Sequence, residues 1–357
     1  MLERVSIIIP TYNEAENIRA IVPKISEVFK AHGIDGKIIV VDDNSPDGTW
    51  KVAEELGSRY PVKSVRRQGE RGLSSAVIKG FEYADGDIIG FMDADFSHSP
   101  DQIIDLLQAF TLSNADLAIG SRYMDAGKIS KWPFLRRLNS WGATLLASPF
   151  TSIKDPMSGF FFFRRSVIEG VSLNPIGFKL GLEILAKGKY TYSKEVPIVF
   201  QNRLHGESKL TGKVIVEYLK QLWQLLWEVE TPVGQFIKYA LVGGSGLIVN
   251  LAVYSVCMYL LRLHYLPSAI FSFAFAMSGN FLLNRTWTFR VHKVSQLNAG
   301  SQFTRFALVC LMGLGINLFL LHLLHSVLGL HELLAQFLAV LSATSVNFIG
   351  SKRWAFK

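Results

Sequence analysis

The sequence predicts an α/β domain with a mostly parallel, doubly wound sheet, followed by an all-α domain of four transmembrane helices. Three observations lead to this prediction. Short apolar runs alternate with helical patterns up to about Phe200, which is typical of a sheet with helices on both faces. Several of these runs end in acidic residues. From Phe236 onward long apolar segments dominate, each near the roughly 20 residues that a membrane helix needs.

The first part of the chain is predicted to begin with a strand over residues 5–9 and a helix over 15–31. In that helix Ile18, Ile21, Val22 and Ile25 recur at helical spacing. The same reasoning predicts the elements that follow: a strand over 37–41, a helix ending near 59, a strand over 62–65, a helix over 73–83, a strand over 87–92 and a late strand over 195–200.

Three of the predicted strands end in acidic residues: Glu14, then Asp42 with Asp43, then Asp93 with Asp95. Ligands of open parallel sheets bind at the carboxyl ends of strands, so these side chains are expected to converge on one crevice. Turn and N-cap chemistry is the ordinary alternative for such acids. We expect it to hold for Asp47 and to fail for Asp43.

The pair Asp93 and Asp95 ends a run that is apolar enough to be buried on both faces. Two carboxylates in that place are costly unless a cation is near, and Mg²⁺ binds through one or two carboxylates plus phosphate oxygens. A Gly-rich dinucleotide motif does not follow the first strand, and a P-loop motif is also missing from the sequence. Both classes of nucleotide site are therefore disfavoured.

Four short motifs carry a resemblance to a known family. They are residues 10–14 (PTYNE), 41–45 (VDDNS), 92–95 (MDAD) and 120–123 (GSRY), with further matching stretches at 155–160, 174–179 and 206–210. Together they resemble the inverting family-two glycosyltransferases of GT-A fold, and among these the archaeal dolichyl-phosphate mannose synthases. The likeness spans nearly the whole chain.

The resemblance implies roles for individual residues. Around the nucleotide sugar it places Pro10, Tyr12, Glu14, Val41, Asp43, Asp93, Ala94, Asp95, Arg122, Arg203 and Lys209. Around the acceptor phosphate it places Arg122, Arg136, Arg203 and Lys209, with Asp95, Arg122 and Arg136 as the catalytic residues. The same resemblance implies that Asp95 is the main ligand of Mg²⁺ or Mn²⁺. The family has a Gln two residues after this Asp and this chain has Ser97, so Ser97 is the expected second ligand, with water or His98 as alternatives.

A phosphate acceptor explains why no general base stands out after Asp95. A phosphate monoester is mostly dianionic near neutral pH, so it needs cations to guide it and no base to deprotonate it. The segment 128–138 interleaves basic residues with Trp132, Phe134 and Leu135, a pattern that suits a helix at a membrane surface. An ordinary amphipathic helix is the alternative.

The membrane half consists of two copies of one unit at constant spacing. Phe236 matches Phe303, Asn280 matches Asn347, and the chain resembles small GtrA-type membrane domains. The spans are predicted at 236–261, 266–284, 303–328 and 333–350, as two helical hairpins. The asparagines within these spans are expected to form hydrogen bonds between the helices rather than to line a path for the lipid.

Charges at the ends of the predicted spans set the orientation. All Lys and Arg residues but Arg262 fall on one side, which the positive-inside rule makes cytoplasmic. The first ten residues are too acidic for a signal peptide. A multi-pass protein of the cell membrane is therefore expected, with both termini and the catalytic domain in the cytoplasm. The predicted domains are 1–205 (catalytic), 206–231 (interfacial helix) and 232–357 (membrane).

The resemblance implies transfer of mannose from GDP-mannose to dolichyl phosphate, with inversion at C1, at the cytoplasmic face of the bilayer. A UDP-glucose-dependent polyprenyl-phosphate glucosyltransferase is the nearest alternative, since it would use the same residues. A lipid-handling membrane protein with a non-catalytic GT-A domain is an alternative of another class. Nucleic acid is not an expected partner.

Overall fold

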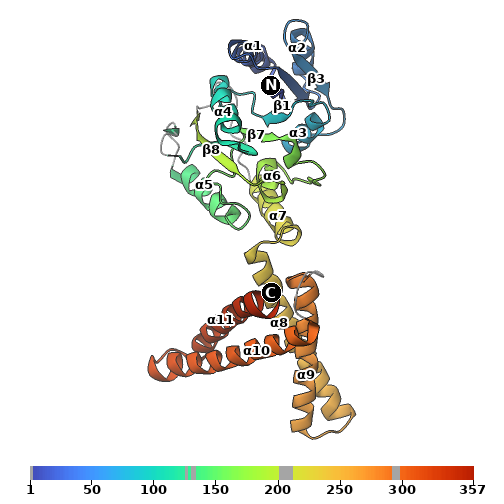
Figure 1. The fold of residues 1–357 in the computed structure, drawn as a ribbon, viewed down its shortest axis with the longest axis vertical. Helices are drawn as coiled ribbons and strands as arrows, with labels where there is room; N and C mark the ends of the chain where they lie inside the picture. Colours follow the sequence, from blue (N-terminus) through green and yellow to red (C-terminus); the bar gives the residue numbers. More distant parts are fainter. Residues whose placement is uncertain (1–2, 125–127, 130–133, 201–211, 292–297) are drawn as a thin grey trace. The chain divides into compact units, whose positions relative to one another are not determined.

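The computed structural model describes residues 3–124, 128–129, 134–200, 212–291 and 298–357. The chain divides into two compact units, Met1–Val229 and Glu230–Lys357 (Figure 1). Each is described by itself. The finer division at residues 205 and 231 stays a prediction.

A seven-stranded sheet forms the centre of the first unit. Its strand order is β3-β2-β1-β4-β7-β5-β8, and every neighbouring pair is parallel except the two that involve β7. The chain order reverses between β1 and β4, which makes this the switch point where such sheets bind ligands. The strands are β1 (Val5–Thr11), β2 (Gly36–Asp42), β3 (Val62–Arg66), β4 (Ile88–Phe91), β5 (Leu117–Ser121), β7 (Phe161–Arg164) and β8 (Ser193–Pro197), with a separate parallel pair of β6 (Lys128–Ile129) and β9 (Val199–Phe200).

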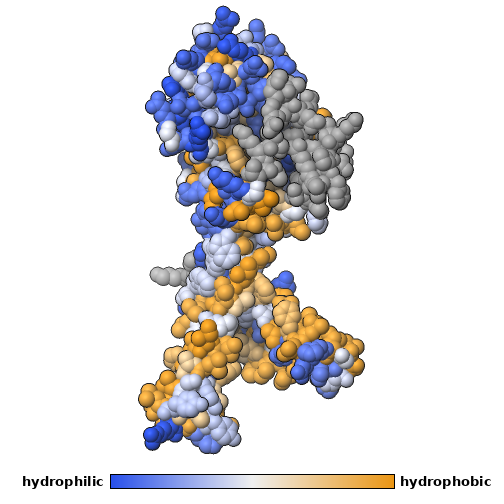
Figure 2. All heavy atoms as spheres, turned by 180° about the vertical axis from the view of Figure 1, so that it is seen from behind, coloured by the Kyte–Doolittle hydropathy of each residue, from blue (hydrophilic) through white to orange (hydrophobic). Residues whose placement is uncertain are grey.

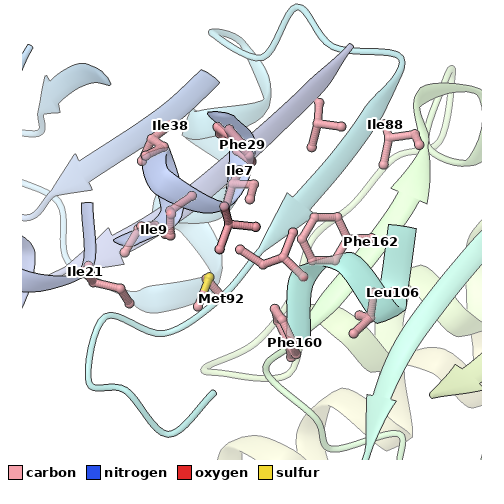
Figure 3. Close-up of a cluster of buried hydrophobic side chains, with 14 of the residues drawn as sticks. Ile7, Ile9, Ile21, Phe29, Ile38, Ile88, Met92, Leu106, Phe160 and Phe162 are labelled. Atoms are coloured by element: carbon pink, nitrogen blue, oxygen red, sulfur yellow. The ribbon is translucent and has the colours of Figure 1, made fainter. Parts of the chain in front are cut away.

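Helices cover both faces of this sheet (Figure 1). On one face Ile21 of α1 and Leu106 of α4 join a buried cluster with Ile7, Ile9 and Phe162 (Figure 3). On the other face α3 and α6 pack through Val77 and Ile184. The helices are α1 (Ala15–Ala31), α2 (Thr49–Leu56), α3 (Leu73–Phe81), α4 (Ile103–Ser113), α5 (Phe134–Ala147), α6 (Leu180–Lys187) and α7 (Gly212–Glu228). Single 3₁₀ turns are η1 (Pro100–Gln102) and η2 (Arg165–Val167). The predicted α/β sheet with helices on both faces is confirmed.

The antiparallel strand β7 is an element that the sequence analysis did not predict. Phe160, Phe161, Phe162 and Phe163 are all fully buried, because β7 lies between β4 and β5 with a helical layer on each face. The Phe162 ring occupies the space that a side chain at Gly90 would need, since a Cβ there would lie 2.4 Å from it. Glycine in β4 thus permits this pairing.

The helix α7 belongs to the first unit and is amphipathic. Tyr218, Leu222 and Leu225 pack against α5 and α6, and the Tyr218 hydroxyl donates to the carbonyl of Ala143. An adjoining side of the helix exposes four large apolar residues: Ile215, Val216, Leu219 and Trp223. The helix predicted to be interfacial therefore buries part of its apolar surface inside the protein.

The second unit contains four helices that are long and apolar enough to cross a membrane, as expected from the sequence. Figure 2 shows apolar residues over most of the visible surface of this second unit. The helices are α8 (Pro232–Ser255), α9 (Tyr265–Leu283), α10 (Ala299–His322) and α11 (Glu332–Gly350), and each is extended by a π-helical segment: η3 (Val256–Leu260), η4 (Asn284–Thr288), η5 (Leu323–Val327) and η6 (Ser351–Ala355).

The two hairpins of this unit make equivalent contacts at matching positions of the sequence repeat. Asn280 packs on Gly246 and Asn347 on Gly313, where a Cβ would clash at 2.4 Å and 2.1 Å. The aromatic contacts between hairpins also come in repeat-related pairs: Phe236 with Phe348 and Phe303 with Phe281, Tyr239 with Phe348 and Phe306 with Phe281, Phe289 with Phe348 and Phe356 with Phe281. Asn280 and Asn347 therefore pack against glycines within their hairpins. The predicted interhelical hydrogen bond is not formed at Asn347, whose buried Oδ1 atom has no partner among the described residues.

Candidate active site

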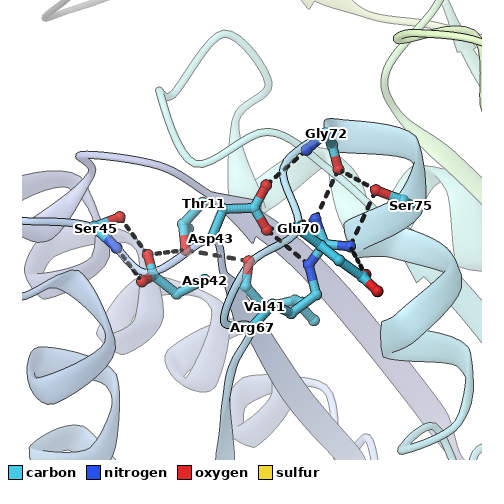
Figure 4. Close-up of polar contacts among 9 residues, drawn as sticks. All are labelled: Thr11, Val41, Asp42, Asp43, Ser45, Arg67, Glu70, Gly72 and Ser75. Carbon is cyan, nitrogen blue, oxygen red and sulfur yellow. Dashed lines mark hydrogen bonds and ion pairs between the residues drawn. The ribbon is translucent and has the colours of Figure 1, made fainter.

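The ends of β1 and β2 are joined by a buried carboxylate, Asp42. It accepts hydrogen bonds from the Thr11 hydroxyl at 3.0 Å and from the Ser45 amide at 2.8 Å (Figure 4). Asp47 accepts from Thr49 and from the amide of Ala15. Both acids stabilise turns between strand and helix. This is the role expected of Asp47. Asp43 is the acid of this segment that does not stabilise a turn in this way and is the candidate for binding a ligand.

Asp43 forms a buried ion pair with Arg67, which comes from the loop after β3. Arg67 Nε donates to Asp43 Oδ1 at 2.7 Å, and the amide of Gly72 donates to Asp43 Oδ2 at 2.8 Å (Figure 4). The guanidinium also donates to Ser75 and to the carbonyl of Gly72. A carboxylate has about four acceptor positions, so Asp43 keeps capacity for a ligand while it fixes the basic loop.

Four more predicted nucleotide residues lie at the same edge of the sheet. Pro10 and Val41 are register partners in β1 and β2. Tyr12 follows β1, and the guanidinium of Arg71 lies 4.6 Å from the centre of its ring. Glu14 precedes α1 and accepts a hydrogen bond from Asn17 at 2.6 Å.

The third acidic strand end is that of β4, which the sheet places beside β1. Asp95 is buried and accepts from the amide of Ser97 at 3.0 Å. Asp93 lies against Gly159, where a Cβ would come within 3.1 Å of its Oδ2 atom. Ala94 is buried between the two acids. The three acidic strand ends are thus neighbours at one edge, as the sequence predicted.

A second buried ion pair lies at the end of β5. Arg122 donates from its backbone amide, from Nε and from one terminal nitrogen to Asp155, at 2.9, 2.7 and 2.7 Å. Asp155 is fully buried. Burial alone would lower the pKa of Arg122, but the hydrogen bond and charge of Asp155 raise it above its usual value. Arg122 is therefore a fixed and permanent cation.

His98 is buried close to these charges, and its ring stacks on Phe160 with 5.0 Å between centres. Burial, with the charge of Arg122, lowers the pKa of His98 to about 4. The imidazole is thus neutral at pH 7 and adds no positive charge to the site.

The donor atoms at the end of β4 fit a hard divalent cation. Asp93 and Asp95 supply carboxylate oxygens, and the buried Ser97 hydroxyl has no hydrogen-bond partner among the residues that the structure describes. Within the described residues no group of three or more acidic, His or Cys side chains forms a metal cage. That suits Mg²⁺ or Mn²⁺, which take few protein ligands and complete their shell with water and substrate phosphates.

The structure does not describe every predicted residue. Arg203 and Lys209 lie outside the described residues, and Arg136 lies in α5 in a stretch whose side chains are not described. Two residues of the site were not predicted at all: Asp155 and Arg67. Asp155 belongs to a stretch noted for its resemblance, and Arg67 to a basic loop, but only the fold shows that each pairs with a predicted residue.

Comparison with known proteins gives matches over both units. Residues 6–171 match the family Glycosyl transferase family 2, and residues 238–356 match the GtrA/DPMS transmembrane domain. The chain is 42% identical over 365 residues to a dolichol-phosphate mannosyltransferase of Pyrococcus furiosus, and the match covers 99% of each protein. It is 39% identical over 231 residues to a dolichol-phosphate mannosyltransferase of Saccharomyces cerevisiae, covering 62% of this chain and 86% of that one.

Solved structures also resemble the chain. Glucosyl-3-phosphoglycerate synthase from Mycobacterium tuberculosis, solved with Mn²⁺ and UDP, superposes with a TM-score of 0.46 at 19% identity, covering 63% of this chain and 79% of that one. Mannosyl-3-phosphoglycerate synthase from Rubrobacter xylanophilus superposes with a TM-score of 0.46 at 19% identity, covering 62% and 74%.

Proposed function

The chain belongs to the dolichol-phosphate mannosyltransferase family, and on that premise we propose that it transfers mannose from GDP-mannose to dolichyl phosphate, with inversion at C1. The near full-length likeness to the Pyrococcus protein supports this activity and favours mannose over glucose as the sugar. One structural observation supports it most directly: the acidic ends of β1, β2 and β4 and the cation Arg122 of β5 lie at one edge of a single sheet.

GDP-mannose is proposed to bind along the acidic side of this edge. Asp43 and Glu14 are expected to accept hydrogen bonds from the base and ribose, and Tyr12 provides an aromatic surface beside them. Pro10 and Val41 are proposed to form the bottom of the nucleotide site. Asp93 and Ala94 would line the ribose and diphosphate.

The cofactor is proposed to be Mg²⁺ or Mn²⁺, held by Asp95 and Ser97. When bound, the metal neutralises charge on the diphosphate and so makes GDP a better leaving group. Because only these two protein side chains are proposed as ligands, coordination positions on the metal remain for diphosphate oxygens.

The acceptor phosphate is proposed to lie on the cationic side. Arg122 is held by three hydrogen bonds to Asp155, so it presents its charge without reorganisation during the reaction. Arg136, Arg203 and Lys209 are proposed to complete this side. A phosphate oxygen then attacks C1 of mannose from the face opposite GDP. The dianionic acceptor needs no general base.

The enzyme is proposed to act at the cytoplasmic face of the cell membrane, with both termini on that side. The four membrane spans and the excess of Lys and Arg at one set of their ends support this orientation. The exposed apolar residues of α7 would lie at the bilayer surface and bring the site to its lipid substrate.

Asp95→Ala, assayed for transfer of radiolabelled sugar to a polyprenyl phosphate, tests the proposal. GDP-mannose should support transfer by the native protein and UDP-glucose should not. Asp95→Ala should abolish transfer without unfolding the protein, whereas Asp101→Ala, which removes an exposed carboxylate six residues further on, should leave it unchanged. Normal transfer by Asp95→Ala would remove the metal role, and preference for UDP-glucose would remove the donor.

A further inference from the structure

The three acidic strand ends of the site share a backbone feature. Just beyond β1, β2 and β4 the chain has one residue with a positive φ: +60° at Asn13, +55° at Asn44 and +57° at Phe96. In this left-handed conformation the Cβ of an L residue lies too close to the following carbonyl oxygen, and Asn tolerates it because its short polar side chain can form local hydrogen bonds. A bulky residue in the same conformation is an outlier. Phe96 is therefore the exception among the three.

The ring of Phe96 is held by its surroundings. The residue is half-buried and packs against the cluster that α1 and α4 form with the sheet, which includes Ile21 and Met92 (Figure 3). The ammonium of Lys24 in α1 lies 5.1 Å from the centre of the ring. A strained backbone conformation persists only where the surrounding structure imposes it. Packing of the ring thus stabilises the positive φ of this residue.

The turn at Phe96 also fixes the carboxylate of Asp95. The amide of Ser97 donates to Asp95 Oδ1 at 3.0 Å, so the chain returns to the acid within two residues. Asp95 and Ser97 are both buried, and they are the two residues proposed to hold the metal. Mg²⁺ requires near-octahedral geometry, so a metal ligand has to be held in a narrow range of orientations.

We propose that Phe96 is a positioning residue of this enzyme: its packed ring holds the turn after β4 in the left-handed conformation and so orients Asp95 and Ser97 for the metal. The inference rests on the proposed function, which places the metal at these two residues. A Phe96 that only filled space would contribute to stability and would leave the metal affinity of the folded protein unchanged.

Phe96→Leu and Phe96→Ile test this proposal as a matched pair. Both variants keep an apolar side chain of the same size, but the branched Cβ of Ile disfavours a positive φ. Calorimetric titration of the full-length protein in the presence of GDP measures the Kd of Mn²⁺, and the melting temperature is measured without metal or nucleotide. Phe96→Leu should bind Mn²⁺ with close to native affinity. Phe96→Ile should bind it about tenfold more weakly, the lower end of the range for residues that orient metal ligands.

Two further variants separate the ring from the backbone. Phe96→Asn introduces the residue found after β1 and β2 but removes the packed ring, so Mn²⁺ binding should again weaken by about tenfold. Leu107→Ala is the control, because Leu107 of α4 packs on the same cluster. It should lower the melting temperature and leave the Kd of Mn²⁺ unchanged.

The outcomes separate this proposal from the proposed function. Equal Mn²⁺ affinity in Phe96→Leu and Phe96→Ile, or native affinity in a folded Phe96→Asn, would overturn the positioning role even in a protein that transfers mannose. If the variants differ as expected but the native protein transfers no mannose, the positioning role stands and the proposed function falls. A native protein that binds no Mn²⁺ would overturn both the metal site and the role of Phe96.

Discussion

Two buried ion pairs stand at the carboxyl edge of the sheet, and they reverse the positions of acid and base. At β2 the acid Asp43 follows the strand, and Arg67 comes from a neighbouring loop. At β5 the base Arg122 follows the strand, and Asp155 comes from a neighbouring loop. The sheet therefore presents carboxylates on one side of the edge and a guanidinium on the other.

The difference matches the two kinds of group that the reaction brings together. Ribose hydroxyls, base N–H groups and a metal ion bind to carboxylates, whereas phosphate oxygens bind to guanidinium groups. Burial of each partner keeps both pairs rigid. Arg67 donates its other hydrogen bonds to Gly72 and Ser75, so it organises a loop, whereas Arg122 is the residue proposed to contact substrate phosphate.

Removing the acid of the cationic pair should have the largest effect. In Asp155→Ala, Arg122 loses three hydrogen bonds and stays buried without its counter-charge. Breaking such a pair costs about 3–5 kcal/mol of stability, and a displaced guanidinium should lower kcat/KM by about 100-fold or more. Chemical denaturation and the radiolabel transfer assay measure the two effects.

Glu169→Ala is the control for Asp155→Ala, because Glu169 is an exposed acid in the segment after β7. It should leave stability and transfer unchanged. A folded Asp155→Ala protein with native kcat/KM would show that Arg122 needs no fixed orientation.

Much of this edge was predictable from the sequence, and the reason is local. Strand ends, turns and acid pairs are determined by residues that are adjacent in the sequence, so Glu14, Asp43 and Asp95 were found beside their strands. Parallel strands then bring such ends together whatever the loops do. The membrane hairpins were equally accessible, since apolar length and the repeat of Asn280 at Asn347 need no tertiary information.

The ion-pair partners were not predictable in this way. Arg67 is 24 residues from Asp43, and Asp155 is 33 residues from Arg122, so each pairing depends on how loops cross the sheet edge. The antiparallel strand β7 was missed for a related reason. A run of buried phenylalanines does not indicate whether the strand runs parallel or antiparallel to its neighbours. Side-chain type predicts burial, but long-range pairing requires the fold.

Removing the base of the acidic pair should have a smaller effect on catalysis. Arg67→Met releases the loop that carries Gly72 and leaves Asp43 buried without its partner, so the unfolding free energy should fall by about 3 kcal/mol. The KM for GDP-mannose should rise about tenfold while kcat stays within about threefold, because Arg67 pairs with Asp43 on the side of the edge that is proposed to bind the nucleotide. Steady-state kinetics separates the two parameters.

The exposed neighbour provides the control for Arg67→Met. Arg66→Met removes a cation of the same length that contacts Asn44 and Trp50 at the surface, and it should leave the KM for GDP-mannose unchanged. A fall in kcat in Arg67→Met at unchanged KM would contradict the division of the edge into a nucleotide side and a phosphate side.

The smallest expected effect concerns the metal itself and sharpens the acidic side of the comparison. The Ser97 hydroxyl is buried beside Asp95 and has no hydrogen-bond partner within the described part of the chain, so Ser97→Ala should weaken Mn²⁺ binding in the presence of GDP by about three- to tenfold. Ser97→Gln, whose longer amide carries a stronger dipole, should tighten it. Calorimetric titration with Mn²⁺ measures both, and Ser99→Ala serves as the control. Equal Mn²⁺ affinity in all these proteins would mean that Asp95, water and the diphosphate hold the metal alone, which would make the metal bind with the donor rather than before it.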